Sequence, residues 1–290
     1  MDIPQPPNIT EKDLEECRKN NDFCPVLFEW YKYVGIVANY FASIQKNSPA
    51  LISISNIHYS VLLGLLNRCA RLMLANVALS HEGLFGETTA IIDRSIFESA
   101  IKLKWICNKG DDDSFNRFIA EGLKTEVEFK KSINDKIKER GGEKLEIEER
   151  MLNSVDNYIK KSELTEEQIS GAKKLPDLAS MINVVGKDRL AYIAGQKIGS
   201  HHVHGTWVSL WFHYLEEKDG IIRPRDHNCA THVNQYVYIP LVVLDSIKAF
   251  IEYVCKDRDD AKGAVELLRS ISKKILQINS EVVGSDFDTV

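Results

Sequence analysis

The chain has 290 residues, of which 44% are hydrophobic and 27% are charged, and its formal net charge is −5. This composition is that of a globular protein with a hydrophobic core, which excludes a disordered or fibrous chain. The negative charge argues against a surface that coats nucleic acid broadly, although a local basic cleft stays compatible with it. Gly (16 residues) and Pro (8 residues) are scarce. The scarcity of turn residues favours an all-α fold over a fold with many strands.

The N-terminal residues and the cysteines together predict a cytoplasmic protein. The first residues contain neither the basic nor the apolar segment of a secretory signal. The two most apolar stretches, 61–79 and 236–255, are interrupted by charged residues, so we expect core helices and no association with a membrane. The six cysteines are widely spaced, include no Cys-x-x-Cys pair, and are expected to be reduced thiols.

The hydrophobic pattern predicts a multi-helix bundle. Thr10 precedes a run of charged residues and is expected to cap the first helix. Helical spacing of apolar residues predicts further helices over 23–46 and 53–80. The segment 86–108 is apolar on nearly all sides, which is typical of a helix at the centre of a bundle.

A charged region, 111–175, follows this central helix. The residue pair Gly141-Gly142 interrupts it, and the sequence 165–168 has the form of a capping box. We therefore expect two or three solvated helices that form an insertion into a single helical domain spanning 1–278. The last residues, 279–290, are expected to form a disordered tail.

Apolar content returns after Pro176. The pattern predicts one helix to about residue 199 and another over 200–215. A connection rich in turn residues follows, over 216–226. Two final helices are expected over residues 228–256 and 260–278.

The central helix carries a candidate functional pair, Arg94 and Glu98. The two residues are four apart, so they face the same way, and their helix face is otherwise apolar. Burying charge is costly unless the charges are paired, so an ion pair here needs a reason. It either ties neighbouring helices together or holds the arginine towards an anionic ligand.

The segment 199–207 contains three of the eight histidines of the chain. In a helix, Ser200 and His204 share a face with two tryptophans, Trp207 and Trp211. This face is either the wall of a polar pocket or part of a core that includes satisfied histidines. Zinc binding by His204 and the neighbouring His201 is a weaker alternative, because no H-E-x-x-H motif or cysteine pair accompanies them. A serine hydrolase is weaker still, because no G-x-S-x-G motif is present.

A third constellation, Arg225 with His232, stands before the last long helix. An arginine followed by a histidine at this interval resembles the motif of the HEPN superfamily, whose members are helical bundles and often ribonucleases that need no metal. The alternative is structural, with Asp226 or Asn228 capping the helix and the arginines in solvent.

The first two constellations together resemble a bacterial family of unknown function. The resemblance covers residues 55–215 and rests on R-x-x-x-E in one helix and S-x-x-x-H-G about a hundred residues later, with Tyr192 between them. It implies an all-helical bundle in which the four motif residues form one site: Arg94, Glu98, Ser200 and His204. The resemblance implies no established activity.

We therefore expect a HEPN-like protein that cuts RNA without a metal ion or a cofactor, as a toxin or phage-defence effector. His204 would act as the base, Arg94 as the phosphate ligand, Glu98 as its orienting partner and Ser200 as a hydrogen-bond donor. Arg225 and His232 form the alternative pair. RNA and a second copy of the chain are the expected partners. The competing hypothesis is a non-catalytic module that binds a protein through the charged insertion, or a small ligand in an aromatic pocket.

Overall fold

The structure is a computed structural model of the chain, and it describes residues 3–82, 84–225, 229–256 and 258–283. The fold is all-α, as the composition predicts, and the only sheet within the described residues is a two-stranded hairpin. The chain divides into two compact units. A main unit contains residues 1–53, 62–108 and 178–290, and a second unit contains residues 54–61 and 109–177.

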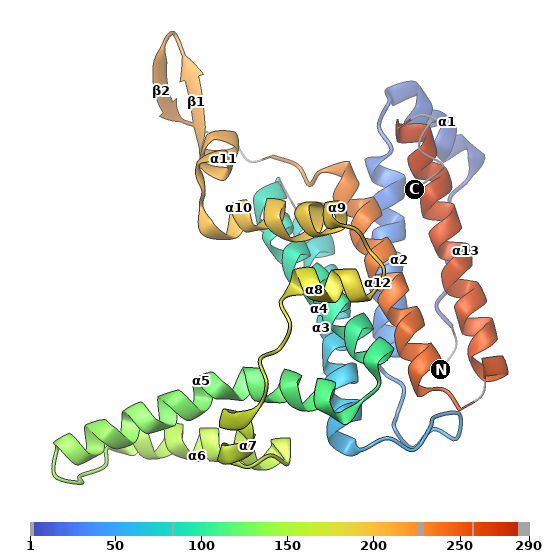
Figure 1. The fold of residues 1–290 in the computed structure, drawn as a ribbon. Coiled ribbons are helices and arrows are strands. Elements are labelled where there is room, and N and C mark those ends of the chain that lie inside the picture. Colours follow the sequence, from blue (N-terminus) through green and yellow to red (C-terminus); the bar gives the residue numbers. More distant parts are fainter. Residues whose placement is uncertain (1–2, 83, 226–228, 257, 284–290) are drawn as a thin grey trace. The chain divides into compact units, whose positions relative to one another are not determined.

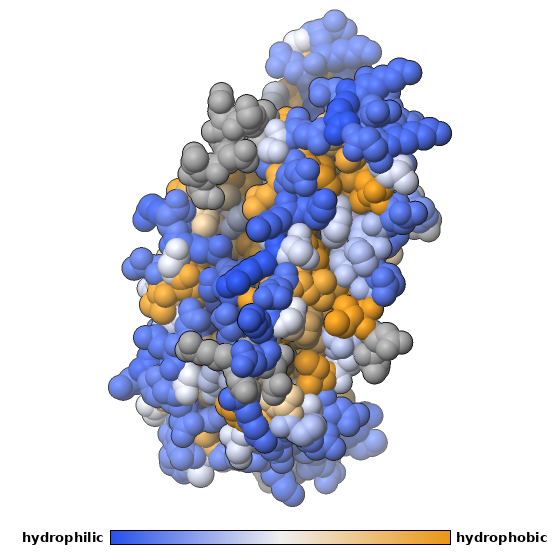
Figure 2. Space-filling model, turned by 90° about the vertical axis from the view of Figure 1, so that its right-hand side faces the viewer, coloured by the Kyte–Doolittle hydropathy of each residue, from blue (hydrophilic) through white to orange (hydrophobic). Residues whose placement is uncertain are grey.

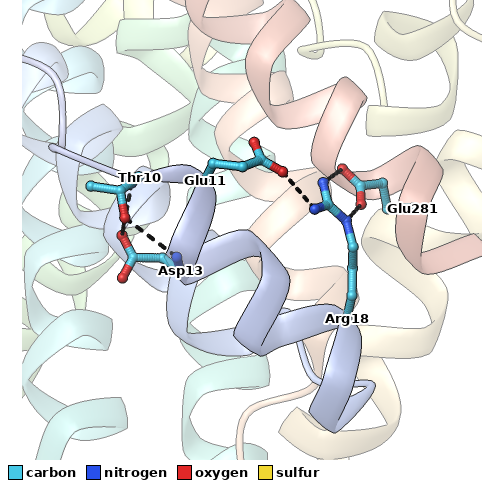
Figure 3. Close-up of polar contacts among 5 residues, drawn as sticks. All are labelled: Thr10, Glu11, Asp13, Arg18 and Glu281. Atoms are coloured by element: carbon cyan, nitrogen blue, oxygen red, sulfur yellow. Dashed lines mark hydrogen bonds and ion pairs between the residues drawn. The ribbon is translucent and has the colours of Figure 1, made fainter.

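The N-terminal half of the main unit contains four helices, α1 (Glu11–Asn20), α2 (Cys24–Phe41), α3 (Asn56–Glu82, which begins in the second unit) and α4 (Gly86–Lys109). Helix α1 begins as predicted at Thr10, whose hydroxyl accepts a hydrogen bond from the Asp13 backbone while its own backbone N–H donates to the Asp13 carboxylate at 2.7 Å (Figure 3). Arg18, at the other end of α1, lies between Glu11 and Glu281 and forms ion pairs of 2.6 Å with both (Figure 3). The second of these pairs fixes the start of the chain to the last helix.

The last two helices, α12 (Val233–Val254) and α13 (Arg258–Val283), run beside α2 (Figure 1). Helix α13 buries one stripe of apolar residues at intervals of three or four, namely Ala261, Val265, Leu268, Ile271, Ile275 and Ile278. The face of the molecule in Figure 2 is mostly hydrophilic, with smaller hydrophobic areas between the polar side chains. Because α13 continues to Val283, the tail predicted from residue 279 is helical over 279–283, and the remainder lies outside the described residues.

Helix α4 is the central helix that the sequence predicts. None of its residues from Thr89 to Cys107 is exposed. Tyr31 of α2 and Asn76 of α3 both donate hydrogen bonds to Asp93 on this helix. An ion pair of 2.6 Å from Lys104 to Asp245 connects α4 to α12. Helix α4 therefore makes polar contacts with three neighbouring helices.

The segment from Pro176 to residue 215 differs from the two continuous helices predicted there. It forms short pieces: α8 (Leu178–Val184), α9 (Arg189–Tyr192), η1 (Ile193–Ile198), α10 (Gly199–His204), α11 (Trp207–Ser209) and η2 (Leu210–Tyr214). Gly186 has φ 77° and stops the first piece, and Gly205 has φ 56° and stops α10. The pieces η1 and η2 are π-helical turns, which hydrophobic spacing does not reveal.

A hairpin occupies the turn-rich connection predicted over 216–226. Strands β1 (Leu215–Lys218) and β2 (Ile221–Pro224) pair antiparallel with Lys218 opposite Ile221. The two turn residues, Asp219 and Gly220, have φ values of 55° and 74°. Positive φ at both positions is the signature of the type I′ turn, whose twist suits a two-residue hairpin.

The second unit contains three helices, α5 (Asp112–Glu139), α6 (Glu146–Ser162) and α7 (Glu166–Gly171), within the region where the sequence predicts two or three. Thr165 caps α7 through the predicted capping box with Gln168. A small hydrophobic cluster of Ile133, Ile137 and Leu152 lies between α5 and α6.

None of the six cysteines forms a disulfide in the described structure, in agreement with the reduced thiols predicted. Among the described helices, one is long and apolar enough to cross a membrane by length and composition, over Asn56–His81 in α3. Buried helices of soluble proteins meet the same criterion, so length and composition do not assign this helix to a membrane.

Candidate functional site

The site is built where α4 packs against the segment 193–214, which runs antiparallel to it. Two glycines four residues apart make this packing close. A Cβ on Gly195 would come within 2.6 Å of the Phe97 ring, and a Cβ on Gly199 would come within 2.9 Å of the Arg94 Cβ. Since real Cβ atoms do not approach so closely, only glycine fits at either position without a shift of its neighbour. The short distance between the two backbones brings polar side chains of both segments together.

The first polar centre is Arg94 with Ser200. The Nε of Arg94 donates a hydrogen bond of 3.1 Å to the hydroxyl of Ser200, which in turn donates to the carbonyl of Gln196 at 2.7 Å. Both side chains are half-buried. The structure thus brings together two of the four residues predicted to form one site.

The predicted ion pair of Arg94 with Glu98 is not formed. Glu98 instead pairs with Lys102, one turn further along α4, at 2.7 Å. Within the described residues Arg94 has no acidic partner. The sequence contained the reason, because a glutamate four residues before a lysine is the favoured orientation of a helical ion pair.

His204 lies one turn after Ser200 at the end of α10, and its side chain is exposed. Four residues of helix correspond to a rise of about 6 Å, so the two side chains stand near each other on one face. The predicted continuation of this face is interrupted at Gly205, where α10 ends. Beyond that break, the rings of Trp207 and Trp211 stack on each other with 5.4 Å between their centroids.

The second polar centre consists of Glu87, His202 and His213, which the sequence analysis did not group. Glu87 is in the first turn of α4, His202 is on α10 and His213 is on η2. One ligand atom from each of the three lies within 4.8 Å of the other two. All three side chains are half-buried. A carboxylate and two imidazoles at this spacing are suited to a transition-metal ion.

Neighbouring groups hold the members of this centre in place. Ser209 donates a hydrogen bond of 2.7 Å to one oxygen of Glu87, and the Tyr214 hydroxyl donates to the other. Nδ1 of His213 lies 3.1 Å from the sulfur of Cys229. Burial is the main cause that lowers the pKa of His202 and of His213.

The histidine pair considered for zinc in the sequence analysis is not the one that the fold gathers. Nδ1 of His201 is engaged with the hydroxyl of Thr206 at 2.7 Å, and His204 is exposed. The residues of the second centre are separated by 115 and 11 positions in the chain, and no local spacing rule links them.

Arg225 and His232 have structural contacts in this fold. Arg225 donates a hydrogen bond of 2.6 Å to the carbonyl of Phe212, which fixes the end of the hairpin to η2. His232 caps α12, because its Nδ1 accepts a hydrogen bond from the Asn234 backbone at 3.2 Å. The helix therefore begins later than predicted, and the two caps proposed at positions 226 and 228 lie outside the described residues.

Asp93 is a buried carboxylate on α4, between Glu87 of the second centre and Arg94 of the first. Its oxygens accept hydrogen bonds from Tyr31 at 3.0 Å, Asn76 at 2.7 Å and Gln235 at 2.5 Å. Burial raises the pKa of Asp93 to about 7, although these hydrogen bonds oppose the rise. The sequence shows this aspartate only as one more polar residue on an apolar helix.

Comparison with models of protein families gives a match. Residues 59–222 match a family of unknown function, DUF5677, and this range contains both polar centres. Searches of curated proteins and of solved structures gave no match. The match is consistent with the resemblance to a family of unknown function over residues 55–215. Because it covers more than half of the chain, the protein belongs to the DUF5677 family.

Proposed function

We propose that this protein is HEPN-like and cleaves RNA through attack by a ribose 2′-OH group. The observation that carries the proposal is the guanidinium of Arg94, which is half-buried, is bonded through Nε to Ser200 and has no acidic partner in the described parts of the chain. A guanidinium held in this way keeps its two Nη groups for a bidentate contact with a phosphate.

In the proposed reaction, His204 accepts the proton of the 2′-OH group. The 2′-oxygen then forms a bond to phosphorus, the bond from phosphorus to the 5′-oxygen breaks, and that oxygen takes up a proton from the imidazolium or from water. The products are a 2′,3′-cyclic phosphate and a 5′-hydroxyl. Arg94 stabilises the negative charge on the phosphorane, and Ser200 orients Arg94, roles that need no metal ion. Glu98 has no part in this scheme, because it is paired with Lys102.

Exposed aromatic side chains favour RNA over other phosphate ligands. Trp207 is 66% exposed, stands three residues after His204 and stacks on Trp211. Phe212 and Tyr214 are also exposed on the following turn. Unpaired bases of single-stranded RNA stack on surfaces of this kind, whereas free phosphate gains nothing from them. The proposal includes the biological role expected from the sequence, that of a cytoplasmic toxin or phage-defence effector.

The test uses the purified full chain with an end-labelled single-stranded RNA in the presence of EDTA. We expect cleavage with 2′,3′-cyclic phosphate ends and none of an all-deoxy strand. Arg94→Ala and His204→Ala should each slow cleavage by about 100-fold or more. Arg189→Ala, which removes an exposed arginine of α9, and His201→Ala are the matched controls and should cleave at the wild-type rate.

Two outcomes would contradict the proposal. RNA binding without cleavage would favour the non-catalytic module, with Arg94 and Ser200 as a phosphate contact. An absence of both binding and cleavage by the folded protein would remove RNA as the ligand.

A further inference from the structure

The three residues of the second polar centre have the chemistry of a metal site that the proposed RNA chemistry does not use. Nδ1 of His202 and Nε2 of His213 are buried, and neither has a hydrogen-bond partner in the described residues. A buried polar atom without a partner is costly, so its presence calls for an explanation, such as an ion. One ring nitrogen from each histidine and one carboxylate oxygen of Glu87 lie within 4.8 Å of one another.

The spacing of the ligand atoms suits an ion after a small closure. In a tetrahedral site with bonds of about 2.0 to 2.2 Å, neighbouring ligand atoms are about 3.3 to 3.6 Å apart. The ligand atoms here are at most 4.8 Å apart, and rotation of the two imidazole side chains about their χ angles can close the remaining difference. Each carboxylate oxygen of Glu87 already accepts one hydrogen bond, yet it has a second lone pair for the ion.

The surroundings match those of metal ligands in proteins. The contact of His213 Nδ1 with Cys229 holds that nitrogen and leaves Nε2 for the metal. Ser209 and Tyr214 orient the carboxylate of Glu87 in the same manner.

We infer that Glu87, His202 and His213 bind one divalent transition-metal ion, for which Zn²⁺ is the first candidate. Imidazole ligands favour such an ion over Mg²⁺ or Ca²⁺, which prefer oxygen ligands. The three residues come from α4, α10 and η2. The ion would therefore fix α10 and η2 to the central helix α4.

The inference is tested on the full chain, free of any affinity tag and stripped of metal with a chelator. Zn²⁺ affinity is measured by competition with a chromophoric chelator, without RNA. We expect one equivalent per chain. His202→Ala and His213→Ala should each weaken binding by more than about 100-fold, and Cys229→Ser, which removes only a supporting contact, by about tenfold. His201→Ala and His204→Ala, on the same helix, are the matched controls and should bind as the wild type does.

A second measurement keeps the inference testable if a histidine variant does not fold. Co²⁺ added to the wild-type chain should give the visible absorption of a four- or five-coordinate site, and an excess of Zn²⁺ should remove it. No absorption and no Zn²⁺ binding by the wild type would overturn the inference. Zn²⁺ binding that survives both histidine changes would also overturn it. Metal binding is measured without RNA, and RNA cleavage is measured both in EDTA and with the Zn²⁺-loaded chain, so the two proposals can fail separately.

Discussion

Gly199 lies directly against Arg94, so that a Cβ on the glycine would stand 2.9 Å from the Cβ of the arginine. The hydroxyl of Ser200, the next residue, reaches the same arginine only because the two backbones approach this closely. The close approach of the helices and the assembly of the site therefore depend on the same glycine.

We predict that Gly195→Ala and Gly199→Ala each lower the free energy of unfolding by about 1 to 3 kcal/mol, the usual cost of overpacking. Gly64→Ala is the matched control, because a Cβ on Gly64 meets nothing within 4 Å in the helix α3. That change should raise stability by up to about 1 kcal/mol through helix propensity. Urea unfolding followed by circular dichroism checks the three variants, and equal effects in all of them would contradict the close packing.

Asp93 makes the stability of the main unit depend on pH. Its pKa is raised from 3.8 to about 7 in the folded state, so the folded state holds the proton more tightly than the unfolded state. The stabilisation of the folded state by the protonated Asp93 carboxyl is therefore complete below about pH 4, and it is lost as the pH rises through about 7. A shift of this size corresponds to about 4 kcal/mol over that window.

The Asp93→Asn variant isolates this contribution. An asparagine cannot titrate, so the difference in unfolding free energy between wild type and variant should change by several kcal/mol between pH 4 and pH 8, in favour of the wild type at low pH. Asp219→Asn, at the tip of the hairpin, is a control for the loss of one carboxylate. A difference that stays constant with pH would show that Asp93 titrates normally.

Arg94 is expected to contribute little to folding. Its removal does not strand Glu98, which is paired with Lys102, and Ser200 keeps its bond to Gln196. Arg94→Ala should therefore lower the free energy of unfolding by only about 1 kcal/mol, mostly through lost packing of the side chain.

The double variant Arg94→Met with Glu98→Leu separates the two interpretations of these residues. If the arginine contacts RNA, this protein should fold and be inactive. A recovery of stability relative to Arg94→Ala, together with full activity, would instead show a packing role. Thermal unfolding and the RNA cleavage assay decide between them.

The charged region 111–175 should be dispensable for the folding of the main unit. Its three helices have their own small cluster of buried residues, and the main unit contains most of the buried side chains. Replacing the region with a short flexible linker should leave a single cooperative unfolding transition. A broad, non-cooperative transition in this shortened chain would contradict the prediction.

Much of the fold follows from sequence because the long helices repeat a simple pattern. The central helix and the last helix were both predicted within a few residues of their bounds. The segment after Pro176 was not, because its apolar residues keep helical spacing although Gly186 and Gly205 interrupt the backbone. Single glycines inside a periodic pattern are compatible with either outcome.

The candidate site was predictable only in part. The structure places Arg94 and Ser200 in contact, whereas Glu98, the expected partner of Arg94, is paired with Lys102, which the sequence places at the favoured interval. No sequence motif indicated the second polar centre, since its three residues meet only when η2 folds back onto α4. Contacts between distant segments depend on tertiary packing, which spacing rules do not encode.

The π-helical turn η1 determines the directions in which the side chains of the following helix, α10, point. The six residues of η1 turn the chain through about the same angle as five residues of an α-helix, so winding them as an α-helix without changing their number would rotate α10 about its axis by about 100°, the angle per residue of an α-helix. Ser200 and His202 would then turn away from Arg94 and Glu87 in the same movement. The π-helical winding of this turn thus keeps both polar centres assembled, although η1 contributes none of their side chains.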